Sequence, residues 1–288
     1  MLLIQTVEND TDVESFVNHI DVFFFNSEEV GGNLKPSTVK AYERLNVNDR
    51  SQMTLSTGRS TFDIDAKYFV YIVANSTFTS DEFSAISSFN ELLQKKQEDQ
   101  YLHLTGLSID NAPKHFLMDA VAVGEASEKA IVINNGVPSD NIVLYAELRR
   151  AAAKVFINIE ASDAVEFKSF TVAQGSEGGL YYVRNLPYDA YLLAEANTAD
   201  KIEAKVRITA KTDSEYFTWH PDMDNKNVTL VTYVYPNHWI DDSVLEHETC
   251  VVMNLPMIFT DNNSVAHEYY NSWYKIPVSQ TSDFERNH

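Results

Sequence analysis

Basic residues, cysteine and long apolar runs are all scarce in this sequence of 288 residues. Its 22 Lys and Arg stand against 42 Asp and Glu, a formal net charge of −20. Such a chain repels phosphate groups, so no nucleic-acid partner is expected. Cys250 is the only cysteine, which excludes an intramolecular disulfide and a thiolate metal cluster. Its apolar neighbours "VVM" predict a buried, unreactive thiol.

Apolar runs are also too short for a membrane-spanning helix, which needs about 18 apolar residues or more. The opening "MLLIQTVEND" has no basic residue ahead of its apolar start, so it is not an intact signal peptide. Two interpretations stay open: a cytosolic protein, or a secreted one whose targeting segment lies upstream.

Motifs of catalysis are absent from the sequence, which contains no HExxH, GxSxG, P-loop or GxGxxG pattern. The stretch "EHETC" gathers several metal-ligating residue types, but in a strand His247 would face away from Glu246, Glu248 and Cys250. We therefore expect no catalytic residues, no cofactor and no enzyme activity. A surface hydrolase that uses an unrecognised pair of carboxylates stays as an alternative function. No such pair can be picked out from the sequence, because acidic residues occur throughout it.

One loop resembles the start of a calcium site. In "HPDMDNKN", Asp222 and Asp224 have suitable spacing, but Lys226 and Asn227 occupy positions that require an oxygen ligand and a glycine. A surface turn is the better interpretation, and no metal is expected.

Short apolar segments separated by turn residues dominate what is present. They include "FVNHIDVFFFN" at 16–26, a strand over Thr61–Asn75, and "KVFINIE" at 154–160. This pattern is typical of all-β proteins, and the length favours two domains. We predict two β-sandwich domains of transthyretin-like or Greek-key type. The residues expected in their cores include Phe23, Val70, Ile72, Val155 and Ile157.

A single segment has helical periodicity. "TSDEFSAISSFNELLQKK" carries apolar residues at helical spacing, and Thr79 with Glu82 forms a capping box. One amphipathic helix over Ser80–Lys96 is therefore predicted.

Aromatic residues are plentiful in the second half. "TWHPDM", "YPNHWI" and "YYNSWYKIP" place Trp219, Trp239 and Trp273 among polar residues. Exposed tryptophan rings stack on sugar faces, which makes a secreted β-sandwich adhesin or lectin the alternative function. Packing within a β-sandwich is the competing interpretation of these aromatics.

Several stretches, in order, resemble the FimA-like fimbrillin family, the subunits of type V pili of Bacteroidota. They are "HIDVFFFNSEEVGGNL", "KYFVYIVANS", "SDEFSAISSFNELL", the expected loop "HFLMDAVAVGEA" with Met118, "ELRRAAAKVFINI", and "TYVYPN" with "YYNSWYKIPV" and the final "FERNH". The resemblance covers nearly the whole chain.

The resemblance implies two domains, at 1–149 and 150–288. It places their junction at a signature formed by Leu148, Arg149, Ala153, Lys154 and Val155. In this interpretation the small residues at 151–153 let the backbone pass closely between the domains.

The resemblance also implies a structural subunit of a cell-surface pilus that supports adhesion. Family members are secreted as lipoprotein precursors, lose their first strand to an arginine-specific protease, and accept a strand from a neighbouring subunit. The implied location is the outer membrane and pilus, and the implied partners are other pilus subunits, host proteins or glycans. No arginine precedes Arg44 here, and the chain stops at His288 where the family continues. We therefore expect a chain that begins near its mature terminus or is not cut there, and a second domain truncated after His288.

Overall fold

The structure is a computed structural model that describes residues 2–6, 16–47, 52–95, 116–137, 142–151, 153–168, 170–171, 177–184, 217–219, 226–234, 237–238, 248–278 and 283–284. The chain divides into two compact units. The first consists of residues 1–98, 113–151 and 189–201, and the second contains the rest. The assignment of domains to 1–149 and 150–288 stays a prediction.

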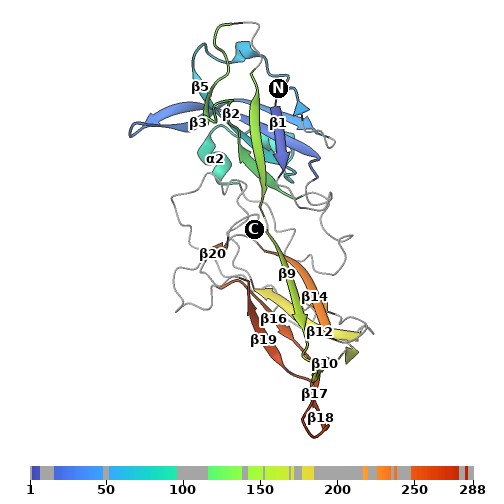
Figure 1. The fold of residues 1–288 in the computed structure, drawn as a ribbon. Coiled ribbons are helices and arrows are strands. Elements are labelled where there is room, and N and C mark those ends of the chain that lie inside the picture. Colours follow the sequence, from blue (N-terminus) through green and yellow to red (C-terminus); the bar gives the residue numbers. More distant parts are fainter. Residues whose placement is uncertain are drawn as a thin grey trace. The chain divides into compact units, whose positions relative to one another are not determined.

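Eight strands form one sheet in the first unit, in the order β3-β2-β5-β6-β8-β1-β4, with β7 paired to β5 (Figure 1). Their bounds are Leu2–Thr6 (β1), His19–Val30 (β2), Asn33–Asn46 (β3), Gln52–Met53 (β4), Lys67–Ala74 (β5), Met118–Val121 (β6), Ala130–Val132 (β7) and Leu144–Arg150 (β8). Met118, expected in a loop, opens β6 and pairs with Ala74 of β5. The expectation of a loop there was wrong.

The core of this unit lies on the central strands β2 and β5. Phe23, Val70 and Ile72 are fully buried, as the apolar runs predicted. The Phe23 ring contacts Tyr42 at 4.9 Å and Phe83 at 5.3 Å between centroids. Aromatic rings at such separations bury much area and add specific edge contacts. This aromatic cluster fixes α1, which contains Phe83, against the sheet.

The strand predicted over Thr61–Asn75 is shorter than expected. A 3-10 turn spans Arg59–Thr61, and β5 begins only at Lys67. Between them Asp65 has a positive φ of 61°, which interrupts an extended backbone. Ile64 is consequently 65% exposed, whereas Phe62 is buried.

The single helix predicted over Ser80–Lys96 is wrong. The structure has two five-residue helices, α1 (Ser80–Ser84) and α2 (Phe89–Leu93). Between them the Ser87 carbonyl accepts the amide of Val39 at 2.9 Å, and Ser88 forms a bridge with Thr38, so this backbone pairs with β3. Serine competes with helical hydrogen bonds and favours caps, which explains the break. The predicted Thr79–Glu82 capping box is confirmed.

The second unit is built from short strands in several small sheets, β10-β17-β18, β11-β12-β16-β19 with β13 on β12, β14-β9, and β15-β20. Their bounds are Ala153–Glu160 (β9), Val165–Phe167 (β10), Phe170–Thr171 (β11), Glu177–Arg184 (β12), Phe217–Trp219 (β13), Asn227–Val234 (β14), Asn237–His238 (β15), Cys250–Asn254 (β16), Met257–Thr260 (β17), Ala266–Tyr269 (β18), Trp273–Pro277 (β19) and Asp283–Phe284 (β20).

The core of the second unit joins β9 and β14 to β16. Val155 and Ile157 are buried as predicted, together with Leu230 of β14 and Met253 of β16. Phe156, which alternates with them, is 64% exposed. The all-β class is thus confirmed for the described residues, whereas the sandwich arrangement stays a prediction. No helix in the described ranges is long and apolar enough to cross a membrane.

Candidate functional site

Strand β1 occupies an interior position of the first sheet, although it comes first in the sequence. It pairs with β8 in parallel over five residues, from Leu2 with Leu144 to Thr6 with Leu148. On its other edge it pairs antiparallel with the two residues of β4. The other strand pairs among the described residues are antiparallel. β1 therefore extends the sheet beyond β8, and the two-residue β4 joins the sheet only through β1.

Strand β8 supplies the surface against which β1 lies. Leu144, Ala146 and Leu148 are buried, whereas Tyr145 is exposed. Tyr145 exchanges two backbone hydrogen bonds with Val123, at 2.8 and 2.9 Å, on the side away from β1. Backbone groups of successive strand residues point to opposite edges, so those of Leu144, Ala146 and Leu148 are directed to β1. Removing β1 would leave these backbone groups unpaired beside three buried apolar residues.

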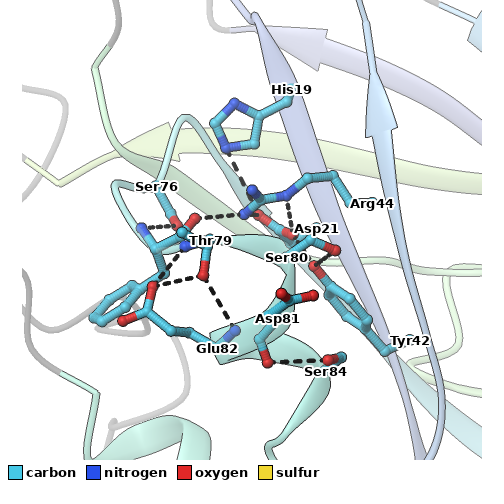
Figure 2. A network of polar contacts seen from close by, with 11 residues as sticks. His19, Asp21, Tyr42, Arg44, Ser76, Thr79, Ser80, Asp81, Glu82 and Ser84 are labelled. Carbon is cyan, nitrogen blue, oxygen red and sulfur yellow. Dashed lines mark hydrogen bonds and ion pairs between the residues drawn. The ribbon is translucent and has the colours of Figure 1, made fainter.

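A buried carboxylate joins β2 to β3 in the same unit (Figure 2). Asp21 is fully buried, and Arg44 donates to both of its oxygens, from Nε at 2.7 Å and from a terminal nitrogen at 2.8 Å. The Tyr42 hydroxyl donates to the same carboxylate at 2.5 Å. His19 lies 3.8 Å from it. A bidentate arginine pair of this kind is a strong, geometrically specific contact.

The same arginine connects the sheet to α1. A terminal nitrogen of Arg44 also donates to the Phe78 carbonyl at 2.7 Å, just before the capping box of Thr79 and Glu82. The Ser80 hydroxyl lies 3.2 Å from the Tyr42 oxygen and donates to it, because Tyr42 gives its single proton to Asp21 (Figure 2). Asp21 is enclosed and its oxygens are occupied, so this network holds the edge strand β3 and α1 in place. No pattern in the sequence had identified it.

The Tyr42 hydroxyl in this network has a shifted pKa, which can be measured. Burial, and then the hydrogen bond to the Asp21 carboxylate, raise the pKa of Tyr42 to about 12, from an ordinary 10.0. A raised folded-state pKa means that the contribution of the protonated hydroxyl to stability is complete below pH 10 and disappears as the pH approaches 12.

We therefore expect the free energy of unfolding of the wild-type protein to fall more steeply between pH 10 and pH 12 than that of Tyr42→Phe. Spectrophotometric titration of the two proteins at 295 nm measures the same group. Their difference curve should have its midpoint near pH 12. A midpoint at the ordinary value of 10.0 would contradict the network as described.

The residues of the predicted junction signature lie at the end of one strand and the start of the next. Leu148 is buried in β8, and Arg149 pairs with Asp119 of β6. Ala153, Lys154 and Val155 begin β9, opposite residues 232–234 of β14. Their role at a domain junction stays a prediction.

Of the three tryptophans predicted to stack on sugars, two lie within the described residues. Trp219 is the last residue of β13, and Trp273 opens β19 with 41% of its surface exposed. Trp239, Asp222, Asp224 and His247 lie outside the described residues. Cys250 is fully buried, as expected. In the described ranges no group of three or more metal-ligating side chains occurs.

The similarity of this chain to known proteins lies in its fold. No family model and no curated protein matches the chain. Among solved structures, the C-terminally truncated tip fimbrial protein Mfa3 of Porphyromonas gingivalis is 11% identical over 96% of this chain and 88% of its own, with a TM-score of 0.48. The fimbrial anchor protein Mfa2 of the same organism is 12% identical over 93% and 81%, with a TM-score of 0.38.

A candidate adhesin of Bacteroides thetaiotaomicron is 6% identical over 94% of this chain and 78% of its own, with a TM-score of 0.41. Because all three TM-scores lie below 0.5, no residue role is transferred from these proteins. Two of these three structures are fimbrial proteins, and the third is a candidate adhesin.

Proposed function

We propose that this chain is a structural, non-enzymatic subunit of a cell-surface pilus, assembled by donor-strand exchange. The observation that carries the proposal is the place of β1, which pairs in parallel with β8 over five residues and has only the two-residue β4 on its other side. When β1 leaves, β8 offers unpaired backbone groups beside the buried positions Leu144, Ala146 and Leu148. An extended segment of a neighbouring subunit can fill that groove by β-augmentation.

Strand exchange of this kind is favourable because the groove without β1 has a high free energy. Unpaired backbone groups and uncovered apolar positions both carry a free-energy penalty, and an open edge is a template for another strand. In the proposed pathway β1 is released from a lipoprotein precursor at the outer membrane by a protease that is not arginine-specific, because no arginine lies between β1 and Arg44 of β3. The partners are other pilus subunits, and the assembled pilus supports adhesion to host proteins or glycans.

Deleting residues 1–6 tests the proposal. Since no arginine precedes Arg44, the strand is removed genetically and not by an arginine-specific protease. We expect the shortened chain to self-associate and to bind a synthetic peptide of residues 1–10, whereas the intact chain does neither. Peptide at about 100 times its dissociation constant should restore about 2.7 kcal/mol of stability.

Two variant peptides make this experiment specific. Ile4 is in register with the buried Ala146, and Gln5 with the exposed Glu147. The Ile4→Asp peptide should fail to rescue, and the Gln5→Asp peptide should succeed. A shortened chain that stays monomeric, keeps its stability and ignores all three peptides would refute strand exchange at this position.

A further inference from the structure

Glu43 of β3 holds the segment that follows β4. One of its carboxylate oxygens accepts the amide and the hydroxyl of Ser56, both at 2.7 Å. The other accepts the amide of Thr57 at 2.9 Å and its hydroxyl at 2.7 Å. Burial by itself would raise the pKa of Glu43, but these hydrogen bonds outweigh it and keep the pKa below its ordinary value. The acceptor is therefore a charged carboxylate, which makes each of the four bonds stronger than a bond between neutral groups. We call Glu43, Ser56 and Thr57 the edge clamp.

The edge clamp joins the two ends of the first sheet. In the order of the strands β3 is at one end and β4 is at the other, with β2, β5, β6, β8 and β1 between them. Yet Ser56 comes only three residues after Met53, the last residue of β4. Three residues of fully extended chain span about 10 Å, so β4 ends within that distance of a residue bonded to the opposite edge.

The strand β4 has few other anchors. Its two residues pair with Leu2 and Leu3 of β1 and, in the described ranges, with no other strand. Met53 is buried, which adds apolar contact. For the described residues 54–57, every hydrogen bond goes to Glu43. The carboxylate is thus the polar contact that keeps β4 in position on the outer side of β1.

We propose that the edge clamp determines how readily β1 is released. β1 has β8 on one side and β4 on the other, so it must break its backbone bonds to both strands before it leaves. While Glu43 holds residues 54–57, β4 stays paired with β1 and covers its outer edge. Once the clamp opens, β4 can move away, and β1 keeps only β8 as a partner. Parts of a protein open locally with free energies set by their own contacts, so Glu43 can raise the free energy of β1 opening without changing that of the central strands.

Hydrogen exchange of the intact chain tests the inference. Glu43→Gln keeps the size of the side chain, but its NH2 group cannot accept the two donors of one of the clamped residues. We expect the β1 amides to exchange about tenfold faster, as for the loss of one hydrogen bond to a charged group, while the β5 amides keep their wild-type rates. The double variant Ser56→Ala/Thr57→Val leaves β3 unaltered and removes only the two hydroxyl donors. It should accelerate the same β1 amides by a smaller factor.

Glu82→Gln in α1 is the matched control. Glu82 accepts the amide and the hydroxyl of Thr79, at 2.7 and 2.9 Å, through a single oxygen, which glutamine retains. This variant removes the same charge from the first unit without touching β4, so β1 should exchange at its wild-type rate. Unchanged exchange of β1 in Glu43→Gln, or equal acceleration in β1 and β5, would overturn the inference.

The biological meaning of the clamp rests on the proposed strand exchange, but the two can fail separately. Hydrogen exchange concerns β1 in the intact chain, whereas strand exchange is tested by deleting residues 1–6. Unchanged β1 exchange in Glu43→Gln refutes the clamp and leaves strand exchange standing. A shortened chain that ignores the peptides refutes strand exchange and leaves the hydrogen-exchange result as it is.

Discussion

Replacement of Asp21 by alanine should destabilise the first unit by about 3 kcal/mol. The carboxylate is fully buried, and its loss leaves Arg44 and Tyr42 without their shared acceptor. Removing one partner of a buried ion pair costs about 3–5 kcal/mol, mainly because the other charge stays behind uncompensated. The Arg44 side chain retains 21% exposure, so water can reach part of it and the lower end of that range applies.

Lys40→Ala is the matched control on the same edge strand. Its ion pair with Asp63 spans 2.9 Å, but the two side chains are 26% and 71% exposed. An exposed pair of this type contributes about 0–1 kcal/mol. Urea unfolding followed by circular dichroism separates the two variants. A loss from Asp21→Ala no larger than that from Lys40→Ala would show that the buried network does not hold the unit.

The position of the tryptophans allows the two units to be followed separately. Trp219, Trp239 and Trp273 all come after residue 151 in the sequence. Tryptophan fluorescence therefore reports the unfolding of the second unit. A change in tyrosine fluorescence that occurs without a change in tryptophan fluorescence reports the unfolding of the first unit. In Asp21→Ala the unfolding midpoint followed by circular dichroism should fall, while the midpoint followed by tryptophan fluorescence stays that of the wild type.

Replacement of Phe23 by alanine should cost about 3–5 kcal/mol, the range for a large aromatic residue lost from a packed core. Its ring is fully buried and contacts Phe25 at 5.9 Å, Tyr42 at 4.9 Å and Phe83 at 5.3 Å. The cavity would lie between β2, β3 and α1, so α1 should also become less protected. Hydrogen exchange of α1 amides measures this directly.

Phe156→Ala is the control of matched chemistry. This ring is 64% exposed, and surface changes of this kind stay within about 0.5 kcal/mol. Phe23→Leu should fall between the two, because it keeps part of the buried volume. Equal midpoints for Phe23→Ala and Phe156→Ala would contradict the aromatic core described here.

Local patterns were sufficient for the buried strands. Phe23, Val70 and Ile72 lie in apolar runs, and Val155 and Ile157 alternate with exposed residues, so their burial follows from period and composition. The capping box is equally local, since Thr79 and Glu82 are three residues apart. Such features need no knowledge of which strands become neighbours.

Long-range pairing accounts for what the sequence did not predict. The helix breaks because residues 87–88 bond to residues 38–39 of β3, a contact that no local pattern contains. Asp21 stands alone within an apolar run, a pattern that indicates a buried charge once it is noticed, but its partner Arg44 is 23 residues away. The parallel pairing of β1 with β8 joins residues that are more than 140 positions apart, so spacing could not reveal it.

The central claim is that this chain is built into a pilus, and immunogold electron microscopy of the cells that produce it tests the claim most directly. Antibodies raised against the chain should label filaments that extend from the cell surface, and deletion of residues 1–6 should change the number or length of the labelled filaments. Label confined to the cell interior, or spread over the surface of cells that bear no filaments, would contradict the account.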